Sequence, residues 1–255
     1  CIEDLKYCVG LSTFEQYVYR SAEERDGKGA RSKAGDLDLT IYSLRKYVRL
    51  ALKGNPTITS LLFIPRSEWV SGDARGEQLQ ELRSHILSRH CIGAFLGYLK
   101  AQKERLLGER GQKRIHREEL VAAHGFDTKY AMHMLRLGYQ GIELAVTGLL
   151  SFPMTEPSRS YLLDVRNGKI PYNDCLTKVG LLENELKDCY QTTCLPEHPN
   201  TQLVEEWLTR TYFESWKAWF QNTNLEPPVP GNPDVGFLYW ITFEYRCEFP
   251  ENLDC

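Results

Sequence analysis

The chain has 255 residues, enough to bury a substantial core in one large domain or two small ones. Its composition is that of an ordinary globular protein, with 42% hydrophobic residues, 25% charged residues and a net charge of −3. No apolar run approaches the ~18 residues of a membrane-spanning helix, so we expect no membrane partner.

The cysteine spacings and the absence of several motifs argue against some classes of protein. The eight cysteines form no C-x-x-C pair and no Cys/His spacing typical of zinc, which predicts reduced packing residues of a cytoplasmic protein. The sequence also has no G-x-x-x-x-G-K-[ST], G-x-G-x-x-G or G-x-S-x-G motif. A P-loop, Rossmann or serine-hydrolase protein is therefore poorly supported.

Two strands are predicted near the N-terminus. Residues 14–20 form the first, a polar connector over 22–29 follows, and residues 36–42 form the second. We expect a hairpin with a long, mobile loop. In the second strand Leu37, Leu39 and Ile41 point to one side. Asp38, Thr40 and Tyr42 point to the other.

A basic amphipathic helix should follow that strand directly. Its apolar face carries Leu44, Val48, Ala51 and Leu52, and its polar face carries Arg45, Lys46, Arg49 and Lys53. Gly54 fits a C-cap, and Pro56 fits a stop just beyond it.

The rest of the chain reads as helical until a late strand. Helices are predicted over 84–108, 128–147, 173–190 and 201–220. Apolar, mostly aromatic residues at every second position over 237–249 then predict a strand. That strand should pair with an edge of the N-terminal sheet or with a second copy of the chain, which would be self-association.

The predicted fold class is α+β. We expect a small α/β domain with a mixed sheet over residues 1–70. A helical domain should span 71–225, and a C-terminal extension with its strand should span 226–255.

Asp38 is the strongest candidate for chemistry. A carboxylate held rigidly on a strand can ligate a metal or accept a proton; the alternative is an aspartate that caps a turn at the strand end. Asp36 lies on the same strand face, nearer the loop, and ranks second as a metal ligand.

Three residues of the 128–147 helix share one face. Lys129, His133 and Arg136 stand at i, i+4 and i+7, opposite Ala131, Met134 and Leu135. Cations in this arrangement can bind a triphosphate, and the alternative is an ordinary solvated face.

Three further residues are nucleotide-binding candidates. Tyr98 and Gln102 share a helix face and can stack on and hydrogen-bond a nucleobase, or Tyr98 can belong to the core. Arg166 lies in a turn where it can reach phosphate, or form an ion pair with Asp164.

Five segments resemble a known family. They read, in order, DLTIYSLRKY…GNP over 38–56, GYLKAQ over 97–102, KYAMHMLRL over 129–137, TG at 147–148 and LDVRNG over 163–168. The pattern resembles the predicted nucleotidyltransferases of the DNA polymerase beta superfamily, the group found beside RNA-repair ligases. The resemblance covers about residues 1–190 and does not include the tail.

The resemblance implies that residues 1–70 are the C-terminal part of an incomplete nucleotidyltransferase-like α/β domain and that 71–225 form a substrate- or nucleotide-binding domain. It also implies roles for single residues. Asp38 matches the third metal-binding acid of the superfamily. The first two acids form a D-x-D on an earlier strand, and Cys1–Asp4 resembles the segment that normally follows that strand. Either an N-terminal portion is absent from this sequence, or the chain lacks the main metal site.

The function implied is transfer of an NMP from an NTP to a hydroxyl, with Mg²⁺ or Mn²⁺ as cofactor and release of pyrophosphate. The acceptor would be RNA, another nucleic acid, a protein or a small molecule. The alternative is a catalytically inactive nucleotide- or RNA-binding scaffold of the same fold.

Overall fold

A computed structural model of the chain describes residues 15–107, 109, 117–223 and 239–244, with side chains given up to 215 and at 217. The chain divides into two compact units. Among the described residues, the first unit combines those up to Leu50 with those from Asn200, and the second spans Ala51–Pro199. The predicted domain boundaries near 70 and 225 stay predictions.

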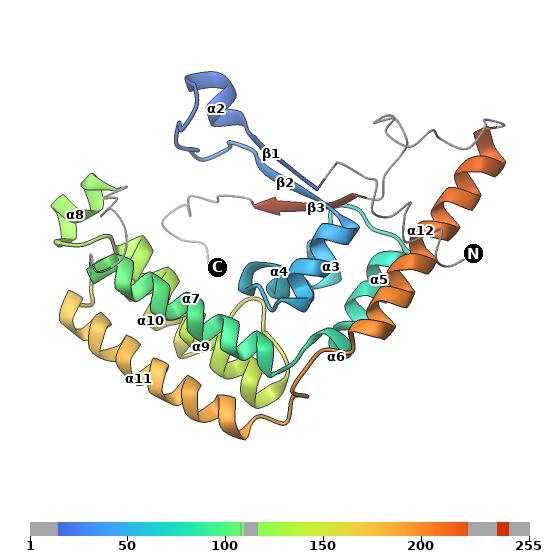
Figure 1. The fold of residues 1–255 in the computed structure, drawn as a ribbon. Helices are drawn as coiled ribbons and strands as arrows, with labels where there is room; N and C mark the ends of the chain where they lie inside the picture. The colour runs from blue at the N-terminus through green and yellow to red at the C-terminus, as the bar shows by residue number, and fades with distance from the viewer. Residues whose placement is uncertain (1–14, 108, 110–116, 224–238, 245–255) are drawn as a thin grey trace. The chain divides into compact units, whose positions relative to one another are not determined.

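The first unit contains a three-stranded antiparallel sheet in the order β1-β2-β3 (Figure 1). Its elements are β1 Gln16–Arg20, α2 Ser21–Asp26, β2 Asp38–Ser43, α3 Leu44–Leu52 (up to Leu50), α12 Thr201–Thr223 and β3 Tyr239–Glu244. In the register, Val18 lies opposite Thr40, and Thr40 lies opposite Thr242. β2 is therefore the central strand of the described sheet.

The connection between β1 and β2 differs from the predicted mobile loop. It contains a short helix, α2, which buries Ala22 and carries Glu23 and Glu24 in its first turn, where acids suit the helix dipole. The predicted strand over 237–249 is described only at 239–244, where its backbone pairs with β2. Its flanks and its side chains lie outside the described residues, so the prediction of self-association stays open.

α3 confirms the predicted amphipathic helix. Leu44, Val48 and Ala51 are buried, together with Tyr47 on the same side. The helix ends at Leu52, and in the turn that follows the Gly54 amide donates to the Ala51 carbonyl from a left-handed backbone (φ +67°). Pro56 follows α3 as predicted, and it is also the first residue of the next helix. Proline suits this N1 position because the first amides of a helix have no partner within it.

The second unit is helical in its described part. Its elements are α4 Pro56–Leu61, the 3₁₀ turn η1 Arg66–Glu68, α5 Ala74–Glu81, α6 Arg83–Ile86, α7 Arg89–Leu107, α8 Glu118–His124, α9 Thr128–Thr147, α10 Ser158–Arg166 and α11 Tyr172–Thr192. The predicted long helices match α7, α9 and α11 closely. The helix predicted from residue 84 is interrupted at 87–88, between α6 and α7.

α9 is the central helix of this unit and packs against α7, α10 and α11 (Figure 1). Two glycines allow the close approach: Gly138 lies against Leu99 and Leu182, and Gly141 lies against Phe95 and Leu186. A Cβ at either glycine would lie only 3.0–3.1 Å from those side chains. Ten residues of α9 are buried, which makes it the core of the unit.

The α+β prediction is confirmed by the antiparallel sheet of the first unit and the helices of the second. Within the described residues, no helix combines the length and the hydropathy needed to cross a membrane.

The Gly54 turn provides a test of the fold. A Cβ at residue 54 would lie 2.6 Å from Cys91 Cα and would require a left-handed backbone at a non-glycine residue. Gly54→Ala should therefore lower the free energy of unfolding by about 2–4 kcal/mol, measured by urea denaturation.

Gly125→Ala is the matched control. Gly125 has a similar backbone (φ +80°), but a Cβ at residue 125 would meet no neighbour within 4 Å, so only the backbone strain of about 1–2 kcal/mol applies. Equal losses for the two variants would contradict the close packing of Gly54 on the start of α7.

Candidate functional site

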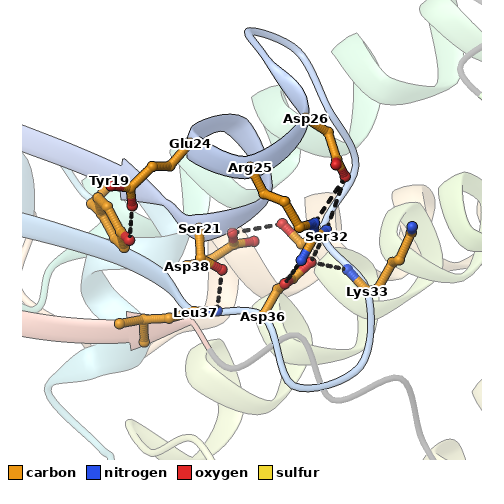
Figure 2. Close-up of polar contacts among 10 residues, drawn as sticks. All are labelled: Tyr19, Ser21, Glu24, Arg25, Asp26, Ser32, Lys33, Asp36, Leu37 and Asp38. Atoms are coloured by element: carbon orange, nitrogen blue, oxygen red, sulfur yellow. Dashed lines mark hydrogen bonds and ion pairs between the residues drawn. The ribbon is translucent and has the colours of Figure 1, made fainter.

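Asp38 begins β2 and is almost completely buried, with 7% of its surface exposed. The hydroxyl of Ser32 donates a hydrogen bond of 2.6 Å to its Oδ1 (Figure 2). Ser32 is itself buried and comes from the β1–β2 connection. The connection therefore lies over the carboxylate and supplies a neutral donor to it.

An ion pair holds that connection in place. Arg25 Nη1 lies 2.6 Å from Asp36 Oδ1, and its Nη2 lies 3.1 Å from Oδ2 (Figure 2). The Lys33 amide donates to the same Oδ2 at 2.7 Å. These donors, Arg25 first, lower the pKa of Asp36 to about 2.

The base of the connection is closed by Ser21. Its amide donates to the Leu37 carbonyl at 2.9 Å, and its hydroxyl accepts from the Leu37 amide at 2.8 Å. Asp36 therefore lies in the connection, before β2, and not on the strand face of Asp38 as the sequence predicted. Its two oxygens are engaged by Arg25, so a metal at Asp36 would have to displace a bidentate guanidinium.

The two carboxylates fit a divalent metal unequally. Carboxylate oxygens are the ligands that Mg²⁺ and Mn²⁺ prefer, and Asp38 carries its carboxylate on a strand, hydrogen-bonded by Ser32. Among the described residues, however, no group of three His, Cys, Asp or Glu side chains could hold a metal ion. The described part of the chain thus supplies Asp38 as one ligand and not a complete centre.

In the second unit, the start of α9 is fixed by Asp127. Its carboxylate accepts from the Tyr130 amide at 3.0 Å and from Arg117 Nη1 at 2.9 Å. The first turn of the helix, with Lys129, is thereby held in a defined position. Lys129, His133 and Arg136 share one face of α9 as predicted and are half-buried, so this face is not fully solvated.

His133 is not a cation, which corrects one part of the prediction. Burial, together with the charge of Arg136, lowers its pKa to about 4. Arg136 Nη2 lies 2.9 Å from His133 Nδ1. The neutral imidazole can accept a hydrogen bond from the guanidinium, and it then orients Arg136.

The remaining candidates also lie in the second unit. Tyr98 is 44% exposed, and its hydroxyl accepts from Asn55 Nδ2 at 3.0 Å, so it is not a core residue. Gln102 is half-buried, and its Oε1 has no hydrogen-bond partner within the described residues. Phe95 of α7 packs against Gly141 of α9, and Leu99 packs against Gly138, so the two helices run antiparallel. Gln102, one turn further along α7, therefore lies alongside the middle of α9.

Arg166 reaches the same helix from α10. Its Nη1 lies 3.4 Å from the hydroxyl of Thr128, the first residue of α9. Asp164, the predicted alternative partner, pairs with Lys169 at 2.8 Å. Lys129 belongs to the N-terminal turn of α9, and Arg166 contacts that turn from α10.

A shallow hollow of about 280 Å³ lies elsewhere in the second unit. Its lining residues are Arg66, Trp69, Glu77, Gln80, Glu81 and Arg83. It contains none of the predicted site residues, and Arg66 is occupied by Glu77 and by the ring of Trp69. We assign it no role.

The structure gathers the candidates in two groups, one in each unit. Asp38, with Ser32 and the Arg25–Asp36 pair, belongs to the first unit, and the nucleotide-binding candidates belong to the second. That both groups face one cleft stays a prediction. Ser32 was missed because a lone serine in a polar connector carries no motif.

Comparison with known proteins gives one finding. The family model described as "RlaP: RNA repair pathway DNA polymerase beta family" matches residues 1–209. No curated protein and no solved structure matches the chain. The family match includes every candidate site residue and does not include β3.

The protonation of His133 can be measured directly by NMR titration of its imidazole. We expect a pKa near 4, and Arg136→Ala should raise it while leaving it below 6.5, because burial is the larger cause. Lys129→Ala, on the same helix face, should leave it unchanged. Since the unfolded chain binds this proton near pH 6.5, His133 should make the fold less stable as pH falls from 6.5 towards 4. A wild-type pKa near 6.5 would contradict this account.

Proposed function

The chain belongs to the RNA repair pathway DNA polymerase beta family, and on that premise we propose that it is a metal-dependent nucleotidyltransferase. The reaction moves an NMP from an NTP to a hydroxyl and releases pyrophosphate. The observation that carries the proposal is Asp38: a buried carboxylate at the start of the central strand, hydrogen-bonded by a neutral hydroxyl.

Asp38 is the described residue proposed to hold Mg²⁺ or Mn²⁺. When bound, such a metal neutralises phosphate charge and activates the attacking hydroxyl. Ser32 occupies Oδ1, which fixes the direction of the carboxylate and keeps it from rotating. The further acids that a two-metal centre requires are not among the described residues, and the resemblance assigns them to a D-x-D segment.

Residues of the second unit are proposed to bind the nucleotide. Lys129 and Arg166 place positive charge at the first turn of α9, and Arg136 offers a guanidinium oriented by His133. Tyr98 is exposed enough to stack on a base. RNA is the acceptor that the family description favours.

A second candidate function follows from the single metal ligand proposed among the described residues. A protein with this fold but without the remaining acids would bind nucleotide or RNA without catalysis. The two candidates differ in one measurement: release of pyrophosphate from an NTP in the presence of Mg²⁺ or Mn²⁺ and an RNA acceptor.

Asp38→Asn should abolish nucleotidyl transfer. The assay uses the protein that the native gene encodes, the four α-labelled ribonucleoside triphosphates, an RNA acceptor and Mg²⁺ or Mn²⁺. Loss of the charged oxygen should lower the rate at least about 100-fold, with the melting temperature as a check on the fold.

Asp36→Asn is the matched control, since it changes a carboxylate two residues away that is paired with Arg25. We expect a smaller loss of activity there. Full activity in Asp38→Asn would refute the role of this residue, and an inactive wild type would favour the binding protein.

Arg136→Ala should weaken NTP binding about tenfold, because a hydrogen bond to a charged group contributes about 1.5 kcal/mol or more. Isothermal calorimetry of each NTP measures this. Lys187→Ala removes an exposed α11 cation paired with Glu183 and should leave the affinity unchanged. Equal affinity for wild type and Arg136→Ala would make the α9 face an ordinary protein surface.

A further inference from the structure

Three cations of α3 converge on a single carboxylate. Arg45 Nη2 lies 3.2 Å from Glu15 Oε1, Lys46 Nζ lies 3.1 Å from Oε2, and Arg49 Nη2 lies 2.9 Å from both oxygens. We call these four residues the α3 basic cluster. Three positive charges against one negative charge leave it with a net charge of +2.

The position of these cations on the helix is unfavourable. Arg45 and Lys46 are the second and third residues of α3, whose first turn has no acidic residue. The N-terminal end of a helix carries partial positive charge, so each cation there opposes the helix dipole by about 0.3–1 kcal/mol. Helix stability alone would place acids at these positions, which indicates that the cations serve another purpose.

The backbone that carries the cluster is firmly held. The Ser43 hydroxyl accepts from the Lys46 amide at 3.1 Å, and the hydroxyl of Tyr212 from α12 accepts from the Arg45 amide at 3.4 Å. Leu44, just before the cations in sequence, and Tyr47 and Val48, between Lys46 and Arg49, are buried. The charged side chains themselves are 22–46% exposed, so they form an open surface on a rigid support.

Glu15 acts as the internal counterion of this surface. Its hydrogen bond with Lys46 and the charges of Arg49 and Lys46 lower the pKa of Glu15, so it stays ionised at neutral pH. It holds the cations close to one another despite their mutual repulsion. A backbone phosphodiester presents anionic oxygens of the same kind, and a nucleic acid presents several of them in a row, so phosphates can take the place of Glu15.

We propose that the α3 basic cluster binds the phosphate backbone of a nucleic acid, and that an incoming phosphate displaces Glu15 from the cations. The choice of ligand rests on the proposed function, in which the acceptor is a nucleic acid. An open surface suits a polymer backbone better than a small ion, which proteins enclose in pockets. Asp38 lies at the other end of β2, about 17 Å away along the strand. The cluster would thus hold a part of the acceptor several nucleotides from the reacting end.

The test measures binding alone. Fluorescence anisotropy with a labelled single-stranded RNA, without NTP or metal ion, gives the affinity at several salt concentrations. Arg49→Ala should weaken binding about three- to tenfold and reduce the salt slope by about 1. Glu15→Gln should tighten binding, because it removes the competing carboxylate and raises the net charge of the cluster to +3.

The sign of the Glu15→Gln effect decides the proposal, since a purely structural ion pair would give no gain in affinity. Lys187→Ala is the control for general charge and should change little, and melting temperatures establish that each variant is folded. Unchanged or weaker binding by folded Glu15→Gln, or unchanged binding by Arg49→Ala, would overturn the proposal.

Inorganic tripolyphosphate, added as competitor, distinguishes the two sources of phosphate. We expect it to displace RNA only in large excess; equal potency per phosphate would overturn the assignment to a polymer. Because the assay requires no turnover, RNA binding that depends on the cluster would stand even if the protein proved inactive.

Discussion

A carboxylate removed from water must be hydrogen-bonded, paired or bound to a metal, and Asp38 imposes this constraint on the first unit. It begins the central strand and is nearly buried, and the chain between β1 and β2 supplies one of its partners. Ser32 provides one donor, and the bidentate pair of Arg25 with Asp36 holds the connection that carries Ser32. Asp36 thus acts as the ion-pair partner of Arg25, and its negative charge neutralises the charge of that arginine.

The second unit obeys a different constraint, the close approach of helices to α9. Gly138 and Gly141 admit side chains from α7 and α11 to within contact of its backbone, which buries one side of the helix completely. The other side keeps its polar residues half-buried, and this partial burial sets their chemistry. It makes His133 a neutral acceptor, and that in turn gives Arg136 a fixed direction.

Much of this could be predicted from the sequence, because the signals were periodic. The 3.6-residue pattern predicted α9 to the residue, and the apolar face of α3 was predicted correctly except that Tyr47 also belongs to it. Alternation identified β2, although the strand begins at Asp38 and not before it. The glycine after α3 was also predicted correctly, because few residues other than glycine adopt the left-handed backbone that Gly54 has.

The contacts that give these residues their roles could not be predicted. The Ser32–Asp38 and Arg25–Asp36 contacts join residues 6 and 11 positions apart through a connection whose path depends on α2, a helix too short to give a periodic signal. The charge state of His133 depends on burial, which a helical face alone does not reveal. Pro56 shows the same limit: it ends one helix and begins another, and only the fold distinguishes the two roles.

The central claim is that Asp38 is the carboxylate on which the chemistry of this protein depends. A crystal structure of the native protein with Mn²⁺ and a non-hydrolysable NTP analogue tests it most directly, because the anomalous signal locates the metal. The account predicts a Mn²⁺ ion coordinated by an Asp38 carboxylate oxygen, with Asp36 still paired to Arg25. Mn²⁺ and nucleotide bound elsewhere, with Asp38 coordinating no metal, would contradict it.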